Sequence, residues 1–129
     1  MYAVVIRTNG EITVEDLKEP LHKATRPILG GLIEVVRPYL LPHPYRMLVN
    51  ESALLLELPI NLIGSYLYGS AFHGNPIVGN IIIMKEAVIN EWGEHDIVGL
   101  EEQEAHNICN YFKEIYVRLT EEDEEEEAI

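Results

Sequence analysis

Two glycine–asparagine pairs stand five residues apart in SAFHGNPIVGNIII, at residues 70–83, and a glycine-rich loop of this kind could bind a phosphate. Such loops usually follow a strand and open a helix, so that free backbone N–H groups and the helix dipole face the anion. Here the stretch follows a short predicted helix and enters a strand, and it lacks the lysine and hydroxyl of a nucleotide-hydrolase loop. We therefore expect a turn at 74–76 and a bulge at Gly79, with a nonstandard ligand loop as the alternative.

The residue spacings give little support for a metal site or for a covalent catalytic mechanism. The histidines form no HxH, HxxH or HExxH pattern, and the single cysteine, Cys109, excludes a disulfide within the chain and a cysteine-rich zinc site. Cys109 lies on an apolar stripe and is expected to be buried and inert. No nucleophile elbow is present. We expect no metal, no cofactor and no catalytic residue, although Glu34, Glu51 and Glu57 keep an enzyme open as a third hypothesis.

Polar residues at the ends of the predicted strands and helices indicate a binding site in the neutral part of the chain. Amide donors and an aromatic ring could hold a base or a ribose there without a basic patch. Of Tyr66 and Tyr68, one can pack in the core while the other contacts a ligand or a subunit. Arg46 is the expected phosphate partner. The predicted ligand-binding residues are Arg46, Asn50, Glu51, Asn61, Tyr66, His73 and Asn75.

The N-terminal segment that must position this site is predicted to be a strand, a tight turn and a short helix. YAVVIR, at 2–7, is β-branched and apolar, and Asn9-Gly10 is a strong turn pair after which ITV re-enters the fold. Thr13 followed by two acidic residues predicts a helix start. Prolines at 20 and 27 keep this helix short or broken, and the glycines at 30 and 31 end it.

The middle of the chain is predicted to contain further strands and one capped helix. GLIEVVRP, at 31–38, is expected to be a strand, and the proline-rich segment 38–46 a loop. Asn61 can cap a short helix that ends at Gly69. Additional strands are expected at 47–50, 53–58 and 77–86.

Apolar residues from Ala105 to Leu119 recur at three- and four-residue intervals, which predicts one long amphipathic helix. Trp92 is expected to fill part of the core. The predicted fold class is α+β, a small, mainly antiparallel sheet with short helices and one long amphipathic C-terminal helix. We expect one domain over residues 1–119 and an acidic disordered tail over 120–129.

The charge of the 129-residue chain, −13 in total, is concentrated in its C-terminal part. Residues 1–85 carry seven acidic and seven basic groups, so the whole excess follows residue 85. Clustered lysine and arginine are needed to bind a phosphate backbone, so we expect neither direct nucleic-acid binding nor binding to an anionic membrane. No run of 18 apolar residues and no leader pattern occurs, which favours a cytoplasmic protein.

Three segments, GGLIEVVRP, MLVNESALLLELPINLIGSYLYG and HGNPIVGNIIIMKE, together resemble the family called domain of unknown function 3846. The resemblance covers about residues 30–86 and departs from the family pattern at Gly64, where alanine is expected. It implies a small α+β protein that is frequent in phage and mobile-element genomes, acts in a bacterial host cell and often opposes host defences. The matching residues are Gly31, Glu34, Val49, Asn50, Glu51, Leu58, Pro59, Asn61, Ile77, Val78, Gly79 and Asn80.

Two functions from different classes are therefore predicted. The first is a non-enzymatic binding protein that antagonises a host defence by sequestering a small nucleotide-derived ligand. The alternative is an acidic protein-interaction inhibitor that imitates the charge of DNA and binds a basic host defence protein through the C-terminal helix and tail. A homodimer is expected from the small size and the tyrosine-rich middle of the chain.

Overall fold

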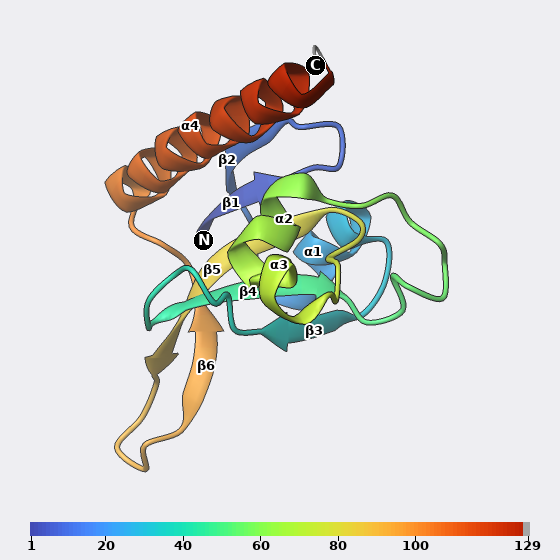
Figure 1. Ribbon diagram of the computed structural model, residues 1–129. Helices are drawn as coiled ribbons and strands as arrows, with labels where there is room; N and C mark the ends of the chain where they lie inside the picture. Colours follow the sequence, from blue (N-terminus) through green and yellow to red (C-terminus); the bar gives the residue numbers. More distant parts are fainter. Residues whose placement is uncertain (128–129) are drawn as a thin grey trace.

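The computed structural model describes the backbone of residues 1–127 and the side chains of residues 1–121. Within these residues, one six-stranded antiparallel sheet has the order β2-β1-β5-β4-β3, with β6 paired to the far half of β5 (Figure 1). The strands are β1 (Tyr2–Ile6), β2 (Ile12–Asp16), β3 (Ile33–Val36), β4 (Tyr45–Asn50), β5 (Ile81–Val88) and β6 (His95–Val98). The helices are α1 (Leu21–Leu29), α2 (Leu62–Tyr68), α3 (Ser70–His73) and α4 (Glu102–Glu127).

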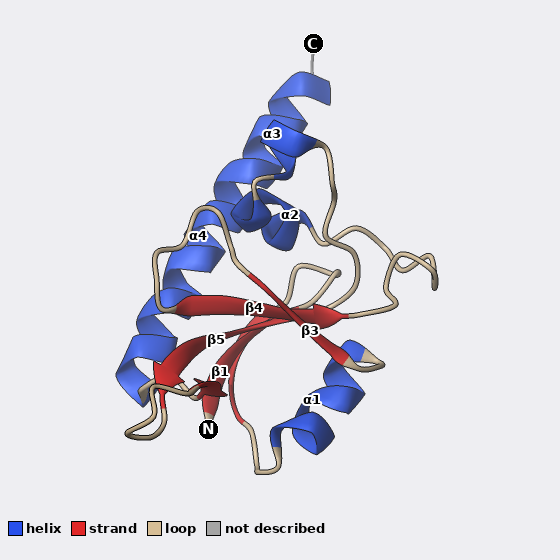
Figure 2. Ribbon diagram, turned by 90° about the horizontal axis from the view of Figure 1, so that it is seen from below, coloured by secondary structure: helices blue, strands red, loops and turns tan. Residues whose placement is uncertain are grey.

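Helices cover both faces of the sheet, with α1 on one face and α2, α3 and α4 on the other (Figure 2). Because side chains alternate along a strand, each strand contributes to two cores. Val5 and Ile82 belong to the core beneath α1, whereas their neighbours Val4 and Ile83 belong to the core that contains Phe112 of α4. This arrangement confirms the predicted α+β class with its antiparallel sheet and long C-terminal helix.

The long helix α4 packs along the β1–β2 hairpin (Figure 1). Among the described residues, no helix combines the length and the apolar character that crossing a bilayer would require. Burial also raises the pKa of the Cys109 thiol, which confirms the expected buried cysteine. Within residues 102–121, the buried side chains of α4 have the predicted three- and four-residue spacing and are Ala105, Cys109, Phe112 and Ile115.

A polar contact joins the first turn of α4 to the sheet. The Glu104 carboxylate accepts hydrogen bonds from the Tyr45 hydroxyl at 2.7 Å and from Lys85 Nζ at 3.2 Å, and also from the backbone N–H of Glu101 at 3.0 Å. Burial alone would raise the pKa of Glu104, but these donors lower it below its ordinary value. The hydrogen bond between Tyr45 and Glu104, together with burial of the phenol group, raises the pKa of Tyr45 to about 12.

The prediction that a helix begins near Thr13 is wrong. Residues Ile12–Asp16 form β2, and all five pair with β1 in an antiparallel ladder. This ladder uses the backbone groups that a helix would need for its own hydrogen bonds. The helix begins later, at Leu21, and contains Pro27; Gly30 ends it in the left-handed conformation, as expected for a glycine at a helix C-terminus.

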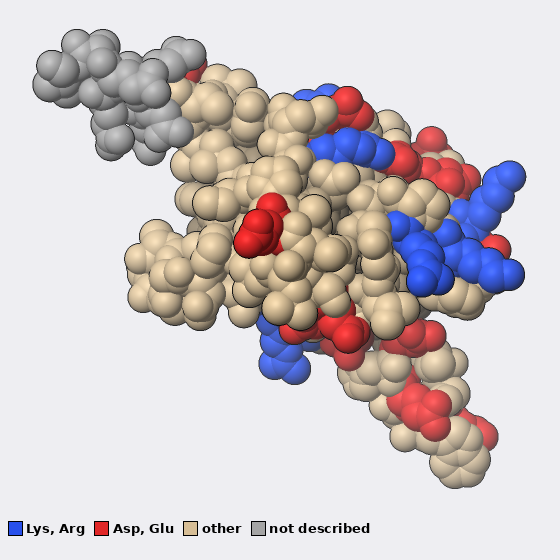
Figure 3. Space-filling model, turned by 90° about the vertical axis from the view of Figure 1, so that its right-hand side faces the viewer, with Lys and Arg blue, Asp and Glu red and all other residues tan. Residues whose placement is uncertain are grey.

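The predicted strand at 53–58 is also wrong, because residues 51–57 form successive turns. The Asn50 side chain accepts from the backbone N–H of Ser52 at 2.8 Å, and Leu56 N–H donates to the Ser52 carbonyl at 3.1 Å. Leu54 and Leu55 consequently point into solvent. This turn projects at the right of Figure 1, on the side that Figure 3 views, where lysine and arginine gather in a few groups and much of the surface is uncharged.

Trp92 does not fill the core, contrary to expectation. It is 79% exposed at the tip of the hairpin between β5 and β6. The Asn90 side chain closes this tip by accepting from the backbone N–H groups of Trp92 at 3.0 Å and Glu94 at 3.2 Å. Strand β6 was not predicted, since HDIV is a short segment with two polar residues and no apolar alternation.

The backbone of α4 continues to Glu127, beyond the domain boundary expected at residue 119. The expected disordered tail comprises residues 120–129. The structure describes neither the side chains of 122–129 nor the backbone of 128–129. The disorder of the tail and the single-domain division therefore stay predictions.

Candidate functional site

A pocket of about 220 Å³ lies between β3, the end of β4, α2 and the loop that precedes β5. We call it the β3–β4 pocket. Its wall combines apolar side chains with carboxylate, amide and phenol groups. The lining residues are Glu34, Val36, Val49, Asn50, Glu51, Ala53, Leu54, Tyr68, Asn75, Pro76, Ile77 and Val78.

Regular structure holds the two sides of this pocket in place. Glu34 of β3 lies opposite Val49 of β4 in the antiparallel ladder, so both belong to the same face of the sheet. On the other side, the Ser65 hydroxyl of α2 exchanges hydrogen bonds with the backbone of Ile77, at 3.0 Å from its N–H and 3.2 Å to its carbonyl. These bonds fix the pocket loop against α2.

Four polar side chains at the pocket are free to bind a ligand. Glu34, Glu51, Tyr68 and Asn75 form no side-chain hydrogen bond to any other described residue. The pocket also lacks a lysine or arginine among its lining residues. Two carboxylates without a cation favour a ligand that presents N–H or O–H donors, and they disfavour a phosphate inside the pocket.

Three of the seven predicted ligand-binding residues line the β3–β4 pocket, namely Asn50, Glu51 and Asn75. Asn50 is nevertheless buried and already bonded, because its Nδ2 donates to the Leu29 carbonyl at 3.0 Å and its Oδ1 accepts from the N–H of Ser52. Its side chain holds the pocket wall, which leaves Glu51 and Asn75 as the predicted residues with free polar groups. Glu34 and Tyr68 also line the pocket, although the sequence did not predict them as ligand-binding residues.

Asn61 lies outside the pocket and serves the fold. Its Oδ1 accepts from the N–H of Gly64 at 2.9 Å, which confirms the predicted helix cap, and its Nδ2 donates to the carbonyls of Ile6 and Gly79, both at 3.0 Å. Only 1% of the residue is exposed, so this side chain has neither a free donor nor access to a ligand.

Tyr66 and His73 also lie outside the residues that line the pocket. Tyr66 is 41% exposed, whereas Tyr68 packs against the core, so the two tyrosines differ in environment as the helix spacing predicts. His73 Nδ1 accepts from the N–H of Asn75 at 3.1 Å, and its ring meets the Tyr68 ring edge-on at a centroid distance of 4.9 Å. His73 therefore contacts two residues that line the pocket, Tyr68 and Asn75, without lining it itself.

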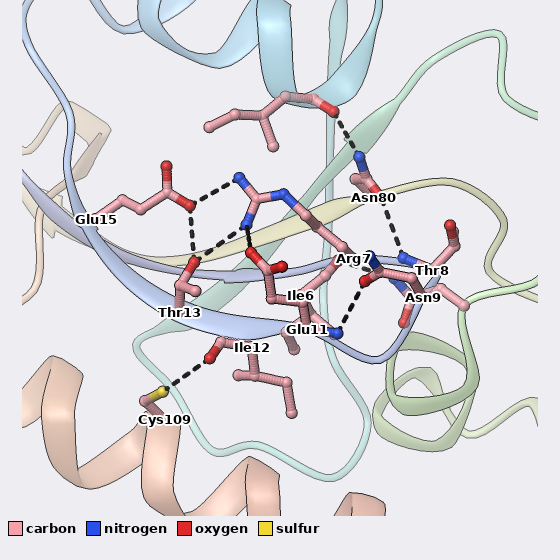
Figure 4. A network of polar contacts seen from close by, with 12 residues as sticks. Ile6, Arg7, Thr8, Asn9, Glu11, Ile12, Thr13, Glu15, Asn80 and Cys109 are labelled. Carbon is pink, nitrogen blue, oxygen red and sulfur yellow. Dashed lines mark hydrogen bonds and ion pairs between the residues drawn. The ribbon is translucent and has the colours of Figure 1, made fainter.

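The second glycine–asparagine pair of the HGNPIVGN stretch is structural. Gly79 has φ +81°, and a Cβ on it would lie 2.9 Å from Leu58 Cδ1. Asn80 Oδ1 accepts from the N–H of Thr8 and its Nδ2 donates to the Ile28 carbonyl, each at 3.1 Å, which fastens the β1–β2 turn to the end of α1 (Figure 4). Only the first pair, through Asn75, reaches the pocket.

Arg46 lies at a second, more open cleft of about 580 Å³. We call it the Arg46 cleft. The expectation that Arg46 would serve the same pocket as Asn50 does not fit this arrangement, since Asn50 lines the β3–β4 pocket and Arg46 lines the cleft. The cleft is lined by Arg37, Pro38, Leu41, His43, Arg46, Glu86 and His95.

Comparison with protein families matches residues 1–113 to the model described as domain of unknown function 3846. The match extends well beyond the segments that carry the resemblance in the sequence and includes the first part of α4, up to residue 113. Comparison with curated proteins finds no match, and comparison with solved structures finds none either.

Proposed function

The chain belongs to the domain of unknown function 3846 family, and we propose that it is a non-enzymatic binding protein that captures a small nucleotide-derived ligand in the β3–β4 pocket. The proposal includes the role that the family resemblance implies, antagonism of a host defence by sequestering its signal. The observation that carries it is the group of four polar side chains at the pocket that have no partner within the described chain.

The charge of the pocket supports a particular part of such a ligand. Glu34 and Glu51 can accept hydrogen bonds from ring N–H and exocyclic amino groups, and Asn75 can both donate and accept. These are the groups that a nucleobase presents on its edge. The apolar wall made by Val36 and Val49 offers contact for the flat faces of the ring.

The size of the pocket supports the same choice. Pockets for drug-sized ligands usually measure about 300–1,000 Å³, so about 220 Å³ suits a base better than a whole nucleotide. The phosphates of a captured nucleotide would then project into solvent, away from the two glutamates. We expect a nucleoside to bind at least as tightly as its 5′-monophosphate.

Calorimetric titration with the four common nucleosides and their monophosphates tests this proposal. Glu51→Gln should weaken binding about tenfold, because a charged acceptor becomes a neutral one. Glu57→Gln is the matched control, since Glu57 lies in the same exposed turn but outside the pocket, and its affinity should stay within about twofold. Absence of binding across the panel, or equal affinities for both variants, would contradict the proposal.

A second candidate function is the acidic protein-interaction inhibitor. It is supported by the exposed carboxylates of α4, Glu102, Glu114 and Glu121, and by the seven acidic residues within 121–129. Arg118 approaches Glu114 only at 3.9 Å, so this surface keeps most of its negative charge. Deleting residues 120–129 should weaken binding to a basic partner and reduce its salt dependence. Unchanged affinity on deletion would remove this candidate.

A further inference from the structure

The Arg46 cleft is formed where the loop between β3 and β4 meets the β5–β6 hairpin, at the opposite end of β4 from the β3–β4 pocket (Figure 1). The N–H of Glu86 donates to the carbonyl of Pro44 at 2.9 Å, and this bond joins the loop to β5. One side of the cleft is therefore formed by strands, and the other is a loop that this bond ties to β5.

Arg46 forms a fixed, buried wall of this cleft. Only 8% of the residue is exposed, and its guanidinium donates from Nη1 to the Tyr45 carbonyl at 2.7 Å and from Nη2 to His43 Nδ1 at 3.4 Å. Nη2 also forms an ion pair with Glu86 Oε2 at 2.9 Å. A guanidinium has five N–H groups. Two donate in these hydrogen bonds, and Nη2 is also paired with Glu86. The Nε–H and the second N–H of Nη1 form no hydrogen bond or ion pair with a described residue, which leaves these two for a ligand while the side chain stays held in one orientation.

His43 is set up as a hydrogen-bond donor by the same contact. Because a guanidinium can only donate, His43 Nδ1 must be the acceptor, and the ring hydrogen then lies on Nε2. Because a guanidinium has no acceptor, the Nε2–H group of His43 does not bond to Arg46 and stays available as a donor. His43 thereby adds a neutral donor to the cationic wall of the cleft.

The balance of charge in the cleft is opposite to that of the whole protein. Arg37 and Arg46 contribute two positive charges and Glu86 one negative charge, a sum of +1 with the histidines neutral, whereas the chain carries −13. Glu86 Oε2 is paired with Arg46 at 2.9 Å, and its other oxygen lies 3.5 Å from His95 Nδ1. Arg37 is exposed and makes no ion pair with another described residue.

From this geometry we infer that the Arg46 cleft binds a small oxyanion, a phosphate or carboxylate group, through Arg37, the Nε2–H of His43 and the two unused N–H groups of Arg46. Glu86 positions Arg46 and does not contact the anion. An ion pair that only stabilised the sheet would need neither Arg37 nor His43, and buried ion pairs on average stabilise a fold little more than apolar packing does. This inference is independent of the base-binding role proposed for the β3–β4 pocket.

The test is a nitrogen–proton NMR titration of the full chain with inorganic phosphate and, separately, with sodium acetate, at constant ionic strength. Saturable shifts of the Arg37 and Arg46 side-chain signals are expected with at least one of them. Response to phosphate indicates a phosphoryl ligand, and response to acetate alone indicates a carboxylate. Absence of saturable shifts with both anions would overturn the inference.

Two exposed arginines provide a matched comparison. Arg37→Gln should weaken anion binding about tenfold, because a charged donor is lost. Arg26→Gln, which removes an exposed arginine from α1, should change the affinity less than about twofold. Equal effects of the two variants would show only general charge attraction and would overturn the assigned site. Glu51→Gln should leave anion binding unchanged, so failure of the β3–β4 pocket and failure of this cleft remain distinguishable.

Discussion

The β3–β4 pocket and the structural asparagine cluster, which we define as Asn61, Gly79 and Asn80, use the same residue types for opposite purposes. In the cluster, the asparagine side-chain groups are bonded to the backbone of β1, α1, α2 or the segment before β5. In the pocket, the amide of Asn75 has no partner among the described residues. Hydrogen-bond partners and burial, and not residue type, therefore separate residues that hold the fold from residues that can bind a ligand.

The largest difference between the two regions is expected at the asparagines. Asn61→Ala should destabilise the protein by about 3 kcal/mol, because it removes a helix cap and leaves the buried carbonyls of Ile6 and Gly79 without a donor. Asn75→Ala should lower the free energy of unfolding by less than about 0.5 kcal/mol, since the side-chain amide of Asn75 forms no hydrogen bond with a described residue. Urea denaturation of both variants measures this difference, and similar costs would remove the distinction.

The glycines that precede two of these asparagines give a smaller contrast. Both have positive φ, +81° at Gly79 and +77° at Gly74, so alanine is strained at either position. At Gly79 the new methyl group would also meet Leu58 at 2.9 Å, whereas at Gly74 it would enter open space. We expect about 2 kcal/mol for Gly79→Ala and about 1 kcal/mol for Gly74→Ala. Thermal unfolding checks the order, and a larger cost at Gly74 would contradict it.

The smallest effects on stability are expected at two tyrosine hydroxyls. Tyr45→Phe should cost about 1 kcal/mol at neutral pH, because Glu104 loses a hydrogen bond, while Tyr68→Phe should be nearly neutral for stability. The folded pKa of Tyr45, about 12, exceeds its ordinary value of 10.0, so the contribution is complete below pH 10 and disappears as the pH rises through 12.

Denaturation measured from pH 9 to pH 12 should therefore show a loss of stability in the wild type that is reduced in Tyr45→Phe. Tyr68→Phe serves as the control and should keep the wild-type slope. The lowered pKa of Glu104 affects stability at acid pH. Its contribution to the free energy of unfolding is present above the ordinary pKa of 4.5 and is lost as the pH falls through the lowered pKa of the folded protein. An alkaline slope that Tyr45→Phe leaves intact would show that other groups cause it.

Much of the fold could be predicted from the sequence because its signals are local. The Asn9-Gly10 turn, the Asn61 cap with its closing glycine and the spacing of α4 each depend on residues close in the chain. The failure at Thr13 has the opposite cause, because pairing with β1 overrides a helix-start signal. The failure at 53–58 is local: the Asn50 side chain closes a turn with Ser52, and this turn overrides the apolar run.

The candidate site was less predictable because it depends on which side chains have partners far away in the sequence. The sequence predicted the Asn61 cap, which uses the side-chain oxygen, but it did not show that the Nδ2 group of Asn61 is bonded to Ile6, 55 residues away, and to Gly79. Arg46 and Asn50 lie four residues apart on one strand, about 13 Å in an extended chain. That separation places them at different clefts, which the short sequence interval concealed.

The central claim is that the β3–β4 pocket, with its unpartnered polar groups, holds the base of a ligand. A nitrogen–proton NMR titration of the full chain with the tightest-binding nucleoside tests it most directly. We expect saturable shifts of the Asn75 side-chain amide and of the Glu51 backbone signal, with the Asn61 side-chain amide unmoved. Saturable binding that leaves Asn75 and Glu51 unshifted, or the absence of any saturable shift, would contradict it.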